Sequence, residues 1–333
     1  MVRPVRLDPS GEIGPTPRQA RGRGWRRSSH GFYVPADVDA EVPMQRVLEA
    51  AVLLPAHAAV TGWAALAWMR CKWFDGYDLS GRPRPVTVAA TAHSLVSRPG
   101  LAICGERLLR SDVQVVDGVR VTIPVRSVTF EMRYARDRRA AVRAHDMAAL
   151  HDLVSIAEVS EWADAHRGWT GIARVRDALP FLDENAWSPP EVDLRLVWEE
   201  LGIRDVVCNH PVFDLAGRHV GTPDVLDLEA GVVGEYDGSL HLEGKQRAKD
   251  IRREGDLRGV GLEYVTMVSA DLRDPSGFKA RTLAARKRAR AVAGPRRWTL
   301  DPPAWWTPSV TVAERRALSN DERRRLLSHR WAA

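Results

Sequence analysis

A change of pattern at Ser188 constrains the fold of this chain more than any other feature of its sequence. Ser188-Pro189-Pro190-Glu191 is a capping-box sequence, with serine as N-cap, proline at the first helical position and glutamate three residues after the cap. The helix that it begins is expected to continue to Leu201 and to end at Gly202. A helix with a well-defined start therefore opens a new structural unit here.

Strand-like segments follow this helix. Three runs rich in valine and other apolar residues are separated by turns at Ala216-Gly217 and Ala230-Gly231, and these runs predict a meander. A charged helix is expected next, and a last strand after it. The runs span residues 206–215, 223–228 and 232–237, the charged helix about 243–257, and the last strand 262–268. The order αβββαβ predicts an α/β (α+β) fold.

The preceding region has a mixed pattern. Helical spacing of apolar residues predicts helices, and alternation predicts strands, two of which would flank a turn at Asp117-Gly118. The expected helices cover residues 43–54, 61–69, 125–150, 156–165 and 170–182, and the expected strands cover 31–34, 86–90, 101–103 and 113–122. This part of the chain is therefore expected to be a mixed α/β region.

A chain of 333 residues is long enough for two domains of ordinary size. Hydrophobic residues make up 44% and charged residues 28%, which is typical of a folded globular protein rather than a disordered one. We expect four segments: a basic flexible arm at 1–30, the mixed region at 31–182, the αβββαβ domain at 188–275, and a basic C-terminal extension at 276–333.

Positive charge is concentrated at the two ends of the chain, within a net charge of +6. Arginine offers paired donors to phosphate, so a polyanionic partner such as DNA is one interpretation. Solvated charged faces are the other, and charge alone does not decide between them. The residues concerned are Arg3, Arg6, Arg18, Arg21, Arg23, Arg26 and Arg27, and then Arg286, Lys287, Arg288, Arg290, Arg296, Arg297, Arg315, Arg316, Arg323, Arg324 and Arg325.

Three carboxylates are expected at neighbouring strand ends. Asp224 begins one strand, and Glu235 and Asp237 lie two residues apart at the end of the next, so the latter two share a face of the sheet. Hydrolysis of a phosphodiester with Mg²⁺ (or Mn²⁺) requires hard oxygen ligands that converge on one cation. The pattern favours such a site, although Asp237-Gly238 alone is also a common turn sequence.

The ordered set of motifs resembles the PD-(D/E)xK nuclease superfamily, and within it the very-short-patch-repair-like endonuclease family. The resemblance covers about a quarter of the chain, residues 188–272. It depends on Ser188-Pro189-Pro190-Glu191, Leu194-Arg195, Pro223-Asp224, Glu235-Tyr236-Asp237-Gly238 with His241, Asp250, Arg253, Gly261, Val265 and Asp271-Leu272.

The resemblance implies a role for each matched residue. Asp224 and Glu235 would be metal ligands, with the carbonyl of Tyr236 as a further one. Asp237 stands where the superfamily has a lysine that helps to orient or deprotonate the attacking water. The role of that lysine would pass to His241, Lys245 or Lys249, or the metal alone would activate the water. Otherwise activity would be lost.

Two further assignments keep alternatives open. Glu191 resembles the helix acid that often completes the metal site, and its other interpretation is the capping box itself. Arg247, Lys249 and Arg253 lie on the charged helix, where they could contact DNA phosphates or pair with acidic neighbours.

The N-terminal region carries a second resemblance. Residues 25–35 resemble the wing of the winged-helix module in the abortive-infection antitoxin family, and residues 60–66 and 117–122 resemble segments that follow that module. Fewer than thirty residues precede the wing, and Pro15, Pro17, Gly22 and Gly24 interrupt them, so a complete helix-turn-helix hardly fits there.

These patterns predict a Mg²⁺-dependent DNA endonuclease acting in repair, restriction or phage defence. The alternative is an antitoxin-like DNA-binding regulator whose nuclease fold is inactive. The chain has no run of 18 uncharged apolar residues and no apolar stretch at its N-terminus, so a cytoplasmic protein without membrane contact is expected. A protein partner or a homodimer stays open.

Overall fold

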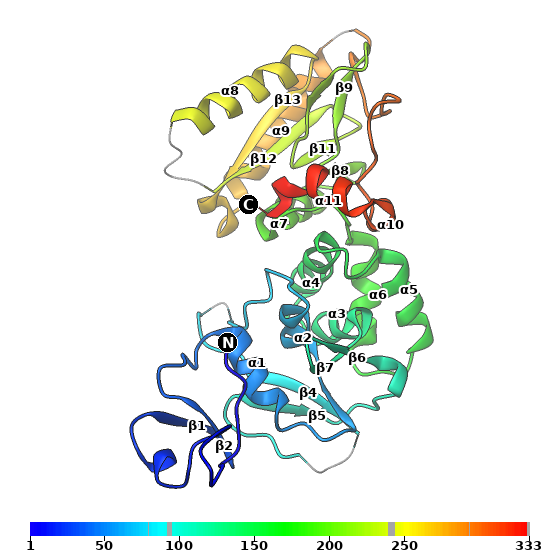
Figure 1. Cartoon of the computed structure of the whole chain (residues 1–333). Coiled ribbons are helices and arrows are strands. Elements are labelled where there is room, and N and C mark those ends of the chain that lie inside the picture. Colours follow the sequence, from blue (N-terminus) through cyan, green and yellow to red (C-terminus); the bar gives the residue numbers. More distant parts are fainter. Residues whose placement is uncertain (79, 92–94, 239–243, 293, 332–333) are drawn as a thin grey trace. The chain divides into compact units, whose positions relative to one another are not determined.

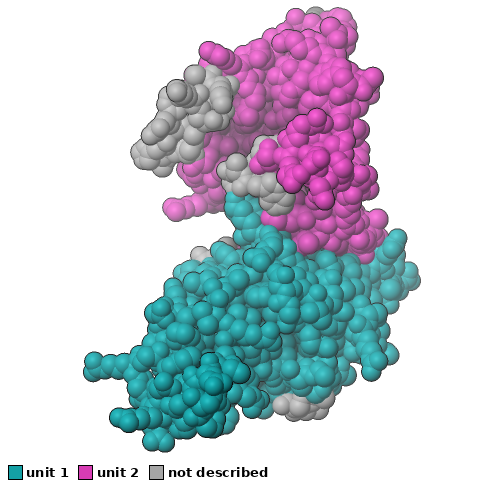
Figure 2. Space-filling view, in the orientation of Figure 1, with its two compact units in different colours: residues 1–134, 161–172 teal, residues 135–160, 173–333 magenta. Residues whose placement is uncertain are grey.

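The computed structural model describes residues 1–78, 80–91, 95–238, 244–292 and 294–331, without the side chains of 244–250, 329 and 331 (Figure 1). The chain divides into two compact units, which are described separately. Unit 1 comprises residues 1–134 and 161–172, and unit 2 comprises residues 135–160 and 173–333 (Figure 2). This division groups residues 135–160 with the C-terminal part of the chain, whereas the sequence pattern changes at Ser188.

A five-stranded mixed sheet forms the centre of unit 1, in the order β5-β4-β3-β7-β6. Its strands are β3 (Ala58–Val60), β4 (Val86–Ala90), β5 (Leu101–Cys104), β6 (Val113–Val116) and β7 (Val119–Thr122). The hairpin β6-β7 turns at Asp117-Gly118, where both residues have positive φ. The expected turn is therefore confirmed, because Asp and Gly tolerate that conformation.

Helices α1 (Pro43–Ala51), α2 (Gly62–Trp68) and α3 (Pro124–Arg133) belong to unit 1. The helical pattern from residue 125 to 150 is not one helix. It breaks after Arg133, and α4 (Arg138–Leu150) restarts at Asp137, whose side chain accepts a hydrogen bond from the backbone of Ala140. An N-cap inside a periodic stretch therefore separates two helices.

The first thirty residues contain more regular structure than the sequence predicts. Strands β1 (Trp25–Ser29) and β2 (Phe32–Pro35) form an antiparallel hairpin, and Val5 bridges to Tyr33. Before this hairpin, the 3-10 helix η1 (Gln19–Arg21) is the one helical element of residues 1–24. The expected arm therefore ends before residue 25, where the sequence also indicates that ordered structure begins, because residues 25–29 pair with β2.

Unit 2 contains the αβββαβ order on a four-stranded sheet, β13-β12-β11-β8. Strands β8 and β12 each pair antiparallel with β11, and β12 pairs parallel with β13. The elements are α7 (Pro189–Glu200), β8 (Val206–Cys208), β11 (Val225–Asp227), β12 (Val232–Asp237), α8 (Gly244–Gly259) and β13 (Glu263–Val268). The expected mixed α+β fold is confirmed.

The strand expected over residues 206–215 is divided. It breaks at Asn209, which has a φ of 44°, and at Pro211, which has no N–H for a ladder. The chain then enters a second sheet, in the order β10-β9-β14, formed by β9 (Val212–Asp214), β10 (His219–Gly221) and β14 (Trp298–Thr299). A separate hairpin is therefore inserted between the first and second strands of the main sheet.

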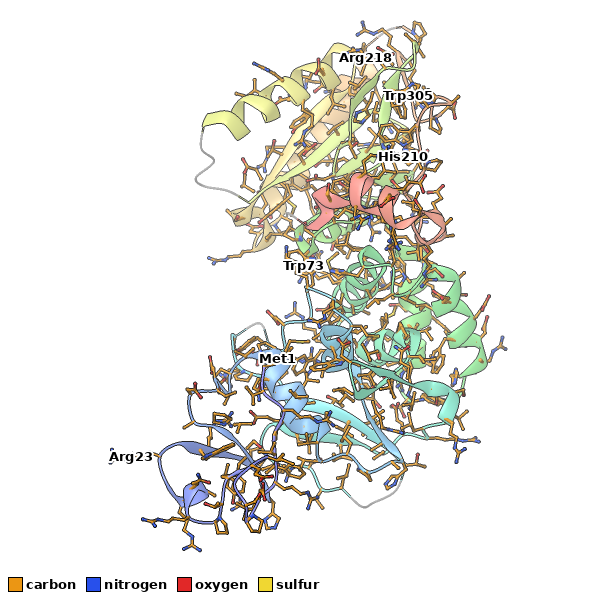
Figure 3. The ribbon with its side chains drawn as sticks, viewed as in Figure 1. Met1, Arg23, Trp73, His210, Arg218 and Trp305 are labelled. Atoms are coloured by element: carbon orange, nitrogen blue, oxygen red, sulfur yellow. The ribbon has the colours of Figure 1, made fainter. Side chains whose placement is uncertain are left out.

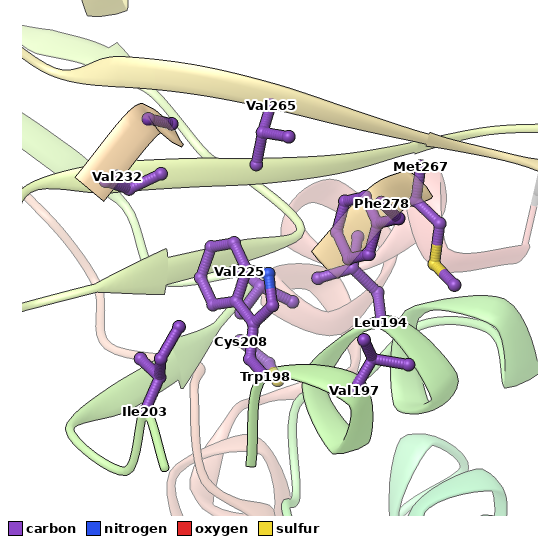
Figure 4. Close-up of a cluster of buried hydrophobic side chains, with 11 residues drawn as sticks. Leu194, Val197, Trp198, Ile203, Cys208, Val225, Val232, Val265, Met267 and Phe278 are labelled. Atoms are coloured by element: carbon purple, nitrogen blue, oxygen red, sulfur yellow. The ribbon is translucent and has the colours of Figure 1, made fainter. Parts of the chain in front are cut away.

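Both faces of the main sheet are covered. On one face, α7 and α9 (Ser276–Ala291) enclose Trp198, Phe278 and the side chains of Val225 and Val265 (Figure 4). On the opposite face, Leu257 of α8 packs with apolar residues of β10, β11 and β12. This layering leaves the ends of β11 and β12 as the place where polar side chains can meet.

The basic C-terminal extension is part of the fold. After β14 the chain forms α10 (Val312–Ala317), α11 (Asn320–Leu326) and the 3-10 helix η5 (Ser328–Trp331). Many of its arginines pair with carboxylates of unit 2: Arg286 Nε lies 2.6 Å from Asp227, and the buried Arg315 Nε lies 2.6 Å from Asp152. Much of the positive charge at this end of the chain is thus neutralised by ion pairs within the protein. The arginine-rich sequence is therefore weaker support for a polyanionic partner.

The remaining helices of the chain are α5 (Ile156–Ala165), α6 (Ile172–Ala178) and the 3-10 helices η2 (Arg110–Asp112), η3 (Leu179–Phe181) and η4 (Ser269–Leu272). Among the described residues, no helix is both long enough and apolar enough to cross a bilayer.

Candidate functional site

Glu191 lies in the first turn of α7 and closes the capping box. The Ser188 hydroxyl donates to Glu191 Oε1 at 2.8 Å, and the backbone N–H of Trp187 donates to Oε2 at 2.8 Å. The N-cap predicted from the sequence is confirmed, because the Ser188 side chain accepts from the Glu191 backbone. Whether Glu191 also serves a metal stays a prediction.

Glu191 is nevertheless more than a cap. The side chain of Asn209 donates to its Oε2 at 2.7 Å, from the point where the chain leaves β8. Burial, together with the nearby charge of Asp224, raises the pKa of Glu191 to about 8. This acid is therefore mainly protonated at neutral pH in the folded chain, and it lies close enough to Asp224 to sense its charge.

The register of β11 and β12 brings Asp224 and Glu235 together. Val225 pairs with Gly234 across these strands, and continuing the antiparallel register by one residue places Asp224 opposite Glu235. Directly opposed residues in an antiparallel pair project to the same face. In addition, Asp224 Oδ2 accepts a hydrogen bond of 2.7 Å from the backbone of Tyr236, which fixes the carboxylate at the strand end.

Glu235 is buried, with 5% of its surface exposed, and its Oε2 lies 2.9 Å from Arg253 Nη2 of α8. The sequence leaves Arg253 open between a DNA phosphate and an acidic neighbour, and in the structure it pairs with a carboxylate of the candidate site. Asp237 follows two residues after Glu235 on the same face and is partly exposed. The strand pair and α8 thus gather two acids and one guanidinium, with a third acid at the exposed end.

Other predicted site residues cannot be placed. His241 lies outside the described residues, and the same holds for the side chains of Lys245, Arg247 and Lys249, although the helix backbone there is described. The Tyr236 side chain leads away from the acids, since its hydroxyl lies 3.2 Å from Ser269 Oγ. A role for the Tyr236 carbonyl stays a prediction.

A divalent metal ion in a protein is held by several oxygen, nitrogen or sulfur donors that meet at one point. Within the part of the chain that the structure describes, no group of three or more Asp, Glu, His or Cys side chains lies close enough to hold an ion. Mg²⁺, however, usually keeps several waters and binds through one or two carboxylates together with substrate phosphates. Asp224 and Glu235 together supply that number of carboxylates, and metal binding by them stays a prediction.

Two hollows adjoin the candidate site, and the sequence analysis missed both. The first is lined by Arg252, Arg253, Asp256 and residues of β10. The second is a pocket of about 590 Å³ that shares Trp187, His219 and Thr222 with it. Arg253 of the first hollow pairs with Glu235, and Asn209 of the second donates to Glu191, so each hollow adjoins one acid of the candidate site.

The second hollow is built largely from segments to which the sequence analysis gave no role. His219 lies on β10, a strand that it did not predict, and Trp305 lies beyond β14 (Figure 3). A signal was nevertheless present: Pro302-Pro303-Ala304-Trp305-Trp306 places two adjacent tryptophans in an otherwise polar extension. Large aromatic side chains in such a context commonly mark a contact surface.

Comparisons of this chain with models of protein families, with curated proteins and with solved structures find no match.

Proposed function

We propose that the αβββαβ region of unit 2 hydrolyses phosphodiester bonds in DNA with the help of Mg²⁺ or Mn²⁺. One observation carries the proposal: Asp224 stands directly before β11 and accepts a hydrogen bond from the backbone of Tyr236, and the neighbouring Glu235 of β12 pairs with Arg253. The element order is also the one that the resemblance to PD-(D/E)xK nucleases implies. Together these features support an endonuclease.

The residues of the chain would divide the work as follows. Asp224 and Glu235 would hold the ion, with the Tyr236 carbonyl as a further ligand. The bound ion supplies Lewis-acid stabilisation of the charge that develops on the phosphate. Glu191, kept neutral by burial, lets the carboxylate of Asp224 remain the charged neighbour, because two close carboxylates resist ionising together.

Arg253 contributes the positive charge that Asp237 does not. Its guanidinium bridges to Glu235 and lines the adjacent hollow. A scissile phosphate in that hollow would meet paired donors, which arginine offers in a geometry that suits phosphate. Since Asp237 replaces the usual lysine, the positive charge beside the metal ligands would come from Arg253, which forms an ion pair with Glu235.

A DNA-binding regulator without turnover is the second candidate, and a specific observation favours it. Arg253 occupies Glu235 Oε2, so the guanidinium neutralises a predicted ligand. An acid neutralised in this way is less available to a divalent ion. The nuclease fold would then act as a DNA-binding scaffold.

Cleavage of supercoiled plasmid in Mg²⁺ or Mn²⁺, run beside a mobility-shift assay, separates the two candidates. The nuclease proposal expects nicking that EDTA abolishes and that Asp224→Asn or Glu235→Gln abolishes. Glu254→Gln is the matched control, since Glu254 lies on the surface of α8 and pairs with Arg258. Circular dichroism establishes that each variant is folded.

Two results would reject the nuclease proposal. One is the absence of nicking in the parent chain with either metal. The other is nicking that survives in both carboxamide variants. Salt-sensitive DNA binding that these variants retain or strengthen, without cleavage in any protein, is the result that the regulator candidate predicts, because each carboxamide removes a negative charge.

A further inference from the structure

We propose that the 590 Å³ pocket beside the carboxylates binds one unstacked nucleobase of a nucleic-acid strand. The pocket has aromatic walls formed by Trp187, His219, Trp305 and Trp306, and its buried polar side chains are Asn185, Asn209 and Arg330. We call it the aromatic pocket. Its link to cleavage rests on the proposed function, and its ligand is inferred from the pocket's own chemistry.

The walls are planar and partly open to solvent. Ring centroids of Trp305 and Trp306 lie 5.6 Å apart, and those of His219 and Trp306 lie 5.0 Å apart. Trp305 is 63% exposed, although a tryptophan ring is among the largest apolar surfaces that a chain can bury (Figure 3). Burial lowers the pKa of His219, so its ring is neutral at physiological pH and can stack without charge.

Two buried polar side chains line the same pocket with unused bonding capacity. Arg330 is 4% exposed; its Nη2 donates to Asn185 and Ser309, but neither Nη1 nor Nε meets an acceptor in the described part of the chain. Asn209 is 2% exposed; its Nδ2 donates to Glu191, while no described donor reaches its Oδ1. Buried polar groups are rarely left without a hydrogen-bond partner. The Nε and Nη1 donors of Arg330 and the Oδ1 acceptor of Asn209 could therefore bind a ligand in the pocket.

This combination selects among ligand classes. An aliphatic chain would leave Arg330 and Asn209 unsatisfied, and a simple anion would satisfy Arg330 while its oxygens faced the Asn209 Oδ1 acceptor. A nucleobase is flat enough to stack on the rings and carries both acceptors and donors on its edge. It is therefore the common biological ligand that matches walls and polar groups together.

The position of the pocket indicates that the bound base belongs to a nucleic-acid strand. Trp187, His219 and Thr222 line both the aromatic pocket and the hollow that contains Arg252 and Arg253. A base in the aromatic pocket would thus place its backbone toward two guanidinium groups and the carboxylates at the ends of β11 and β12. Because a base inside a duplex is stacked, the occupant is a base from a single strand, an end or a flipped position.

Calorimetric titration with two short single-stranded oligonucleotides tests the inference. One carries a single guanine among abasic spacers, and the other carries abasic spacers alone, so both have the same phosphate charge. The titrations use the full chain in EDTA without divalent metal, which makes the result independent of cleavage. We expect the guanine to tighten binding about tenfold, the scale of stacking one base on aromatic side chains.

Variants of the chain test whether the tighter binding of the guanine oligonucleotide comes from the aromatic pocket. Trp305→Ala is expected to remove most of the tenfold preference and Trp305→Phe to keep part of it, while Leu215→Ala, at another exposed apolar residue of unit 2, keeps all of it. Asp224→Asn should also keep it. A base preference that persists while no protein cleaves DNA would support the pocket and reject the nuclease proposal, so the two failures are distinguishable.

Three outcomes would overturn the inference. Equal affinities for the two oligonucleotides would show that no base is bound. A free nucleoside monophosphate that binds as tightly as the guanine oligonucleotide would show that no strand is needed. Loss of a dimer in Trp305→Ala, measured by sedimentation, would assign the surface to a second copy of the chain.

Discussion

Replacing Glu191 by glutamine should change how the stability of unit 2 depends on pH. Burial raises the pKa of Glu191 to about 8 from its ordinary value of 4.5. The folded chain therefore keeps a proton that the unfolded chain releases between these two values, and the free energy of unfolding falls as pH rises through that window. Below pH 4.5 and above pH 8 this group adds no further slope.

The size of the effect follows from the same pair of values. Each pKa unit corresponds to about 1.4 kcal/mol, so ionising Glu191 in the folded state costs up to about 5 kcal/mol at pH 8 and above. Glutamine has the shape of the protonated acid and can still accept from Trp187 and Asn209. The variant should therefore gain stability relative to the parent chain as pH rises, and should differ little from it near pH 4.5.

Urea denaturation at several pH values between 4.5 and 9, followed by circular dichroism, measures this gain. Subtracting the parent from the variant removes the titration of groups that do not interact with Glu191. Glu254→Gln is the control, because Glu254 lies on α8 of the same unit and its side chain is 38% exposed. A difference between parent and Glu191→Gln that stays constant from pH 5 to pH 9 would refute a buried, protonated Glu191.

Three further substitutions test the packing that supports the site, each by urea denaturation. Phe278→Ala should cost about 3–5 kcal/mol, because Phe278 anchors α9 in the main core; a cost below about 1 kcal/mol would mean that α9 is not part of that core. Gly234→Ala should cost about 1–3 kcal/mol, since a Cβ there would lie 2.7 Å from Trp198, whereas Gly255→Ala, with open space, should stabilise α8 by about 0.5–1 kcal/mol; equal effects would contradict the close packing. Arg315→Met should cost about 3 kcal/mol, because Asp152 loses one of its two arginine partners and the carbonyls of Ala149 and Glu184 lose a donor; a neutral result would show that these bonds are not needed.

Local signals explain which parts of the fold the sequence could predict. The capping box at Ser188 and the turn at Asp117-Gly118 are decided within a few residues, and both are confirmed. The pairing of β11 with β12 was also foreseen, because two apolar runs joined by a short turn form a hairpin. The site itself could be predicted only to the extent that its acids lie on such a hairpin.

The missed features depend on partners that are distant in sequence. Nothing near Val212 indicates that β9 pairs with β14, more than eighty residues later. The run over 206–215 therefore looked like one strand, although Asn209 and Pro211 mark its break. Likewise, the pairing of Arg253 with Glu235 and the burial of Arg330 follow from tertiary packing, so local charge alone could not decide between a phosphate contact and an ion pair for Arg253 and indicated nothing about Arg330.

The small sheet β10-β9-β14 joins the insertion between β8 and β11 to the region beyond α9. A fragment cut after residue 275 would keep both carboxylates but would lose Phe278, β14 and the aromatic walls at Trp305 and Trp306. During synthesis, the segment that carries Asp224 and Glu235 is made before α9, β14 and the two tryptophans. The packing around the acids is therefore complete only when these later segments have been made. A chain truncated at residue 275 therefore has the acids without the packing and the pocket that surround them in the complete fold.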